Sequence, residues 1–137
     1  MHALEAAGQT GSADYLALAQ RFYDRHLLRV PPTPDALATF EALAASIAYR
    51  VMNGPSEFNI VGVIKDWDRR ADLGLITQDV LLTTGEFDEI TLDCHETIRD
   101  GVGGRSRLEV LVGCSHLTMV EAPEAYNALV RDFLGPT

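Results

Sequence analysis

The chain has 137 residues, of which 47% are hydrophobic and 23% are charged, and this composition indicates one globular domain, or a piece of one, rather than a disordered chain. Eleven basic residues against twenty acidic residues give a net charge of −9, which repels phosphate backbones and anionic lipids, so we expect neither nucleic acid nor a membrane as a partner. The sequence shows no apolar run of about 18 residues and no secretory leader, and we expect a cytoplasmic protein. The two cysteines, Cys94 and Cys114, lack the spacing of a zinc site, so we expect reduced thiols and neither a metal nor another cofactor.

The first 65 residues have the patterns of helices. Apolar residues at helical spacing predict an amphipathic helix over residues 14–28. After a break at residues 30–32, Thr33 is a suitable N-cap, and an apolar stripe predicts a second, longer helix over residues 34–51. The Asn-Gly-Pro turn at residues 53–55 ends that helix.

Beyond residue 65, short apolar runs alternate with helical patterns. Residues 80–84 and residues 108–112 are apolar runs, each followed by a glycine, and are predicted as buried strands. One helix is predicted between them and another from Pro123 onward. This order indicates a parallel sheet with helical crossovers. Because a parallel sheet of two strands leaves its faces uncovered, we expect further strands upstream and exposed apolar surface in their absence.

Chemically useful side chains follow both predicted strands. The first loop, residues 85–89, contains Asp88, and the second, residues 113–116, ends with His116. Reactive groups of open α/β sheets gather beyond the carboxyl ends of the strands, and neighbouring strands about 4.8 Å apart would bring the two side chains within reach. A carboxylate can orient an imidazole that acts as a general base. The alternative for each residue alone is a solvated surface position, but acid before histidine is the order of the α/β-hydrolases.

Several longer motifs carry a family resemblance. Residues 52–58 (Met-Asn-Gly-Pro-Ser-Glu-Phe) and 65–68 (Lys-Asp-Trp-Asp) resemble the cap of proline iminopeptidases, and the two loops around Asp88 and His116 resemble those of the same family. The resemblance runs from about residue 12 to residue 134. It implies the C-terminal part of an α/β-hydrolase fold, with a mostly helical cap segment over residues 1–65 and the last two parallel strands with their helices over residues 66–137.

The resemblance also implies roles for four residues. Asp88 would be the acid and His116 the base of the triad of a serine aminopeptidase, which releases N-terminal proline or another uncharged residue from short peptides or amino-acid amides. Glu57 and Glu89 would hold the free α-amino group of the substrate through charge-assisted hydrogen bonds. The alternative is that Glu57 caps its own turn and that Glu89 stabilises the start of the following helix.

The sequence contains no nucleophile in a suitable place. No Gly-x-Ser-x-Gly elbow occurs, Ser106 precedes a strand instead of following one, and Ser115 is adjacent to His116 on an extended loop, so the two side chains point apart. The glycine-rich oxyanion loop of the family is also absent. We therefore expect the chain to be inactive by itself, with an N-terminal hydrolase half as its partner. Two other hypotheses stay open: a noncatalytic remnant that binds amines, and another α/β-hydrolase reaction on an ester or amide.

Overall fold

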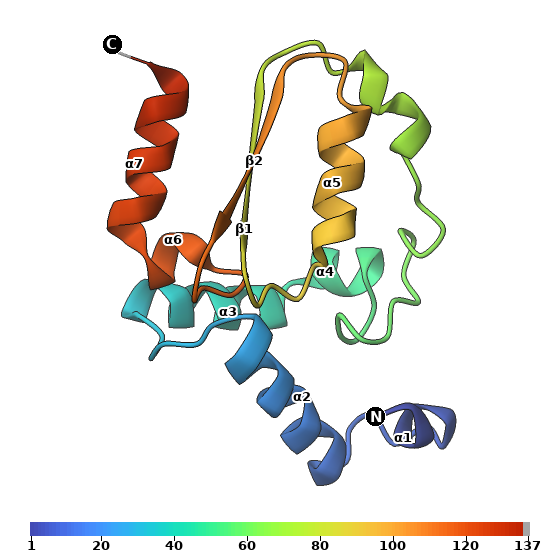
Figure 1. The fold of residues 1–137 in the computed structure, drawn as a ribbon. Helices are drawn as coiled ribbons and strands as arrows, with labels where there is room; N and C mark the ends of the chain where they lie inside the picture. The colour runs from blue at the N-terminus through green and yellow to red at the C-terminus, as the bar shows by residue number, and fades with distance from the viewer. Residues whose placement is uncertain (136–137) are drawn as a thin grey trace.

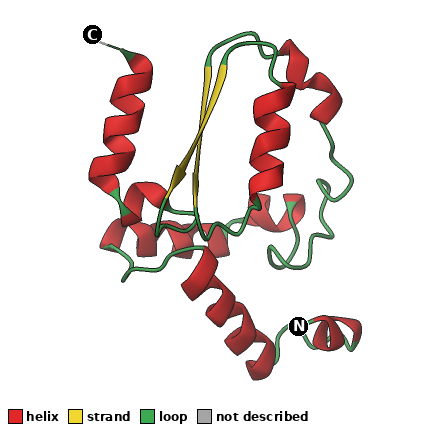
Figure 2. Cartoon of the chain, viewed as in Figure 1, coloured by secondary structure: helices red, strands yellow, loops and turns green. Residues whose placement is uncertain are grey.

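The computed structural model describes residues 1–135 and alternates helices with two strands in its second half (Figures 1 and 2). The elements in chain order are α1 (His2–Ala6), α2 (Ala13–His26), α3 (Pro34–Ala45), α4 (Ile47–Met52), a 3-10 helix (Arg70–Leu75), β1 (Val80–Gly85), α5 (Leu92–Gly101), β2 (Ser106–Leu111), α6 (Thr118–Glu121) and α7 (Pro123–Leu134). None of the helices in this described part is long and apolar enough to cross a membrane.

Side-chain caps set the helix boundaries of the first half. The hydroxyl of Ser12 accepts a hydrogen bond from the backbone N–H of Tyr15 (3.2 Å) and begins α2, which confirms the first predicted helix. Thr33 caps α3 in the same way, as its pattern predicts. The prediction of one continuous helix over residues 34–51 is wrong, because Ser46 has an extended backbone (φ −71°, ψ 121°) and its hydroxyl accepts from the N–H of Tyr49 (3.1 Å). A serine side chain can replace a helical backbone hydrogen bond in this way, so the helix divides into α3 and α4.

The two strands pair in parallel, as their sequence patterns predict. The register runs from Val80 opposite Ser106 to Gly85 opposite Leu111. The second strand begins two residues earlier than its apolar run, because this register continues the pairing through Ser106 and Arg107. Figure 1 shows α5 and α7 on opposite sides of the strand pair, with α5 as the crossover between β1 and β2. The sheet therefore directs both of its carboxyl ends toward the same edge.

The end of α2 meets this edge of the sheet. The backbone N–H groups of His116 and Leu117 donate to the carbonyl oxygens of His26 (3.0 Å) and Leu27 (3.1 Å). The helical first half is thus bonded directly to the loop that follows β2. The division into a cap segment over residues 1–65 and a core segment over residues 66–137, whose last two residues lie outside the described part, stays a prediction.

The interior of the described part is small. Its buried apolar residues are Tyr15, Ala19, Ala36, Leu111 and Cys114. Large apolar side chains lie on the surface, and Val112, the residue after β2, is 85% exposed. The described sheet has two strands, so its apolar side chains have few partners.

Candidate active site

The carboxylate of Asp88 is fixed by the turn that follows β1. Its Oδ2 accepts from the hydroxyl of Thr84 (2.9 Å), and its Oδ1 accepts from the backbone N–H of Ile90 (2.9 Å) and faces Nδ1 of His116 (2.9 Å). The Asp88 side chain is only 4% exposed. Burial opposes its ionisation, but the hydrogen bonds from Ile90, His116 and Thr84 prevail and lower the pKa of Asp88 below its ordinary value. The site therefore holds an oriented carboxylate.

His116 reaches this carboxylate from the loop after β2. Because ionised Asp88 can only accept, Nδ1 of His116 carries the proton, and Nε2 keeps its lone pair. The ring is one third exposed, at 34%. The expected contact between the two side chains is present, and it leaves a nitrogen that can act as a base, while the catalytic roles of both residues stay a prediction.

The two loops interlock where Asp88 and His116 emerge. The N–H of Phe87 donates to the carbonyl of Cys114 (2.9 Å). A Cβ atom on Gly85 would lie 2.2 Å from the carbonyl oxygen of Ser115, so only glycine fits at this crossing. Ser115 is fully buried, and its hydroxyl donates to Glu121 (2.5 Å). Neither Ser115 nor Cys114, whose burial raises the pKa of its thiol, is placed as a nucleophile for His116.

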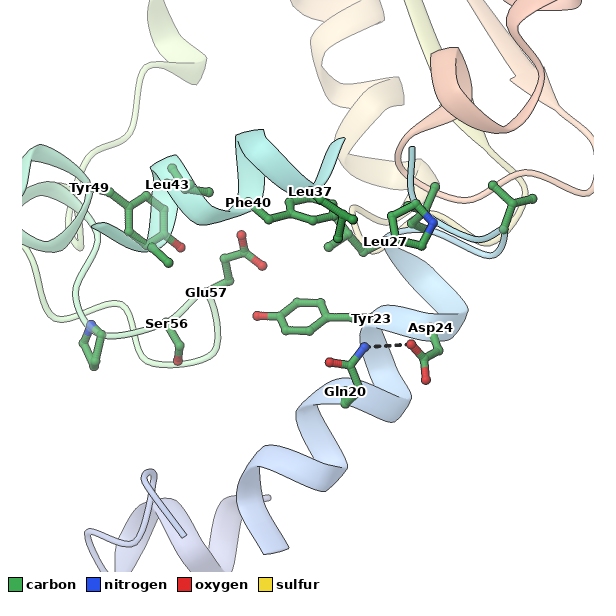
Figure 3. A pocket seen from close by; sticks show the side chains of 15 residues that line it. Gln20, Tyr23, Asp24, Leu27, Leu37, Phe40, Leu43, Tyr49, Ser56 and Glu57 are labelled. Carbon is green, nitrogen blue, oxygen red and sulfur yellow. Dashed lines mark hydrogen bonds between the residues drawn. The ribbon is translucent and has the colours of Figure 1, made fainter. Parts of the chain in front are cut away.

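Glu57 lies on the loop after α4. The buried side chain of Asn53 holds this loop in place. The side-chain amide of Asn53 donates to the Tyr49 hydroxyl (3.1 Å) and to the carbonyl of Ser56 (3.2 Å). In Figure 3 the Glu57 side chain lies between the rings of Tyr23 and Tyr49. Burial and the Glu57 carboxylate raise the pKa of both tyrosines, so their hydroxyls stay protonated at neutral pH. The loop thus presents a carboxylate beside two aromatic rings.

Glu89 is electrostatically coupled to Glu57. Burial raises the pKa of Glu89, the negative charge of Glu57 raises it further, and His116 and His26 act in the opposite direction. Among residues 1–135, neither glutamate forms an ion pair with a basic side chain. The negative charges of Glu57 and Asp88 therefore both act on the Glu89 carboxylate.

A cavity of about 510 Å³ adjoins Glu57 between α2, α3 and α4 (Figure 3). Its walls are mostly apolar, and its polar lining residues are Gln20, Tyr23, Asp24, Tyr49, Ser56 and Glu57. The apolar lining residues include Leu27, Leu28, Val30, Leu37, Phe40 and Leu43. Residues 1–135 contain no group of three or more His, Cys, Asp or Glu side chains placed to hold a metal ion.

Sequence patterns alone do not identify several residues of this site. Tyr23 lies in the predicted first helix and Tyr49 in the segment predicted as one long helix, and neither position marks it as a site residue. The only signal for Thr84 is its place at the end of a strand, four residues before the acid. These residues become visible only when α2, α4 and β1 are brought together in space.

The sequence of this chain is similar to those of several known proteins. No protein-family model matches it. The proline iminopeptidase of Saccharolobus solfataricus is 37% identical over 131 residues, which cover 95% of this chain and 42% of that protein. The proline iminopeptidase of Thermoplasma volcanium is 38% identical over 137 residues, which cover 97% of this chain and 46% of that protein. The chain thus spans a little under half the length of the curated relatives it matches.

Solved structures give the same result. The crystal structure of proline iminopeptidase from Mycobacterium smegmatis matches with a TM-score of 0.85 at 39% identity, over 97% of this chain and 45% of that chain. This similarity confirms the predicted fold class, the C-terminal part of an α/β-hydrolase. By sequence and by fold, the chain is similar to the C-terminal portion of proline iminopeptidases, which are α/β-hydrolases.

Proposed function

We propose that this chain carries the acid, the base and the amino-terminus recognition site of a serine aminopeptidase of the proline iminopeptidase type. The observation that carries the proposal is the 2.9 Å contact between buried Asp88 and His116 at the carboxyl ends of two parallel strands. Its substrates are short peptides or amino-acid amides with a free N-terminus. The relatives are more than twice as long as this chain, and the nucleophilic serine and oxyanion hole belong to the portion that the chain does not cover.

The proposed reaction uses His116 as a proton carrier. Nε2 of His116 accepts the proton of the serine hydroxyl as its oxygen attacks the scissile carbonyl carbon, and it then donates that proton to the leaving amine. Asp88 keeps the ring in the required tautomer and stabilises the imidazolium that forms. Water then hydrolyses the acyl-enzyme by the same proton transfers in the second half of the reaction.

The proposed recognition of the amino terminus rests on Glu57 and Glu89. A substrate ammonium group between them would relieve the repulsion that raises the pKa of Glu89. An internal peptide amide is uncharged and cannot do so, which limits cleavage to the first residue. The apolar cavity beside Glu57 offers space for an uncharged side chain.

A chimera tests this proposal. The N-terminal portion of the Thermoplasma volcanium relative is joined to this chain, which replaces the matching C-terminal portion, and release of nitroaniline from proline p-nitroanilide is measured. We expect turnover in the chimera and a loss of about 10³-fold to 10⁴-fold in kcat for Asp88→Asn and His116→Ala. His2→Ala, at a fully exposed histidine, is the matched control and should retain activity. Full turnover by His116→Ala would refute the proposed base.

The glutamate pair supports a second candidate function, a noncatalytic module that binds amines, because Glu57 and Glu89 could bind an ammonium group without a nucleophilic serine. In that case the chain would bind prolinamide, while the chimera would show no turnover of any proline substrate. N-acetylated substrates separate the third possibility. Equal cleavage of acetylated and free substrates would favour a general amidase or esterase, whereas our proposal expects the acetylated substrate to be rejected.

A further inference from the structure

One residue of α2 is bonded to both of the loops that form the Asp88–His116 pair. Nδ1 of His26 lies 2.8 Å from the carbonyl oxygen of Phe87, the residue before the acid. The backbone carbonyl of His26 accepts the N–H of His116 at 3.0 Å. The last residue of α2 therefore bridges two loops that lie 28 positions apart in the sequence.

The hydrogen bond to Phe87 fixes the proton on the His26 ring. A carbonyl oxygen only accepts, so Nδ1 is the donor in the neutral ring and also in the protonated ring. The contact is therefore compatible with both charge states of the ring. This distinguishes His26 from His116, whose Nδ1 bonds a carboxylate and whose other nitrogen is available for chemistry.

The His26 ring is also connected to the loop that bears Glu57. Its centroid lies 4.7 Å from that of Phe22, and Phe22 packs edge-on against Phe58 at 5.1 Å. Phe58 follows Glu57 directly. A row of aromatic rings thus joins the acid loop to the proposed amine-binding loop.

A second set of contacts holds the same segment in place. The Glu121 carboxylate accepts from the backbone N–H of Arg29 (2.5 Å) and from the hydroxyl of Ser115 (2.5 Å), which adjoins His116. The guanidinium group of Arg29 lies 4.1 Å from the centre of the Phe87 ring. These contacts fix the backbone of residues 26–29, so that substitution of His26 removes one side-chain bond from an otherwise supported segment.

We propose that His26 is a positioning residue that sets the separation of the Asp88 and His116 loops through its Nδ1–H bond to Phe87 and aligns them with the Glu57 loop. Its effect on catalysis rests on the function proposed above, whereas its effect on the Asp88–His116 bond does not. The two effects are therefore measured separately.

Three substitutions isolate the Nδ1 donor. His26→Asn places an amide N–H near the position of Nδ1, His26→Gln places its amide near Nε2, and His26→Phe keeps an aromatic ring against Phe22 without a donor. The native fold of each variant is checked by circular dichroism and thermal unfolding. If His26→Phe does not fold, the comparison between Asn and Gln still tests the position of the donor.

The first measurement is histidine NMR on the chain itself. In the unsubstituted chain and in His26→Asn, we expect the Nδ1 proton of His116 to give a downfield resonance that disappears in Asp88→Asn. In His26→Phe and His26→Gln this resonance should weaken or move upfield, because the hydrogen bond from Nδ1 of His116 to the Asp88 carboxylate is lengthened. Unchanged His116 signals in folded His26→Phe or His26→Gln would overturn the proposal.

The second measurement is turnover in the chimera. His26→Phe and His26→Gln should both lower kcat by about tenfold or more, because the base is misplaced. In His26→Phe KM should change little, because the ring against Phe22 is kept and the amine site is retained. His26→Asn should restore most of the loss, which a change in general stability would not produce. Equal kcat values for Asn and Gln would count against a positioning role. An inactive parent chimera with the expected NMR changes would refute the proposed function and leave the positioning role supported.

Discussion

Asp88 is a buried carboxylate whose charge is favoured by three hydrogen bonds. Since its pKa is lower in the folded protein than in the unfolded chain, ionised Asp88 stabilises the fold above its ordinary pKa of about 4. This stabilisation is lost as the pH falls through the lower, folded-state value. Residues with this behaviour make a protein sensitive to acid.

Substitution of Asp88 by asparagine tests this linkage. Asp88→Asn should lower the free energy of unfolding at pH 7, and the difference from the unsubstituted chain should shrink as the pH falls below about 4. Urea unfolding at a series of pH values measures both curves. Asp66→Asn is a control at a carboxylate that is 88% exposed. Curves for Asp88→Asn and the unsubstituted chain that stay parallel down to acid pH would contradict the assignment.

Glu89 has the opposite linkage, because burial and the charge of Glu57 raise its pKa. The stability that its uncharged form provides is present below the ordinary pKa and is lost as the pH rises through the raised value. At neutral pH, Glu89→Gln should therefore stabilise the protein slightly, by about 0.5 kcal/mol. In the chimera, Glu89→Gln should lower kcat/KM for proline p-nitroanilide by about tenfold or more, since hydrogen bonds to charged groups contribute about 1.5–3 kcal/mol.

A variant that is more stable but has a lower kcat/KM indicates that the original residue binds substrate at a cost to the stability of the fold. Thermal unfolding and kcat/KM give the two readouts, and Glu41→Gln on the exposed side of α3 is the control. A stability loss in Glu89→Gln with unchanged kcat/KM would instead support a purely local role at the start of α5.

Helices and strands were predictable from the sequence where apolar spacing and capping residues indicate the same element. They were not predictable where a side-chain hydrogen bond competes with the apolar spacing. The apolar runs of β1 and β2 and the cap at Thr33 act within a few residues, so local sequence patterns find them. The apolar stripe across residues 34–51 continues through Ser46, and only the competing hydroxyl bond to Tyr49 reveals the break. The contact between Asp88 and His116 follows from the parallel pairing of β1 and β2. The hydrogen bond from His26 to Phe87 depends on the position of the end of α2 relative to the sheet, which the sequence does not indicate.

The crossing of the two loops depends on one glycine of β1. Gly85→Ala would place a Cβ atom 2.2 Å from the carbonyl oxygen of Ser115, and backbone must move to accommodate it. We expect a loss of about 1–3 kcal/mol in the free energy of unfolding, with weaker Asp88–His116 contact in the NMR spectrum. Gly11→Ala is the matched control, because a Cβ atom there meets nothing within 4 Å. Equal stability of the two variants would show that the loops separate freely.

At the scale of the whole molecule, the described part of the chain exposes large apolar side chains to solvent. Leu75, Val63 and Val112 are 75%, 73% and 85% exposed, and the sheet has two strands where a parallel sheet is ordinarily covered on both faces. The relatives have more than half of their length outside the matched region. We therefore expect the N-terminal portion, which corresponds to the unmatched part of the relatives, to cover the surface around β2.

Val112 distinguishes a covered surface from one that stays in water. Val112→Thr keeps the shape of the side chain but replaces a methyl group with a hydroxyl group, which costs little in water and about 1–3 kcal/mol when buried without a partner. The chain by itself should therefore unfold at nearly the same denaturant concentration with either residue, whereas the chimera should lose stability. Binding of an apolar dye should be strong for the chain and weak for the chimera. If Val112→Thr has the same effect in both proteins, this surface is not where the N-terminal portion packs, and the nucleophile would have to approach His116 from another side.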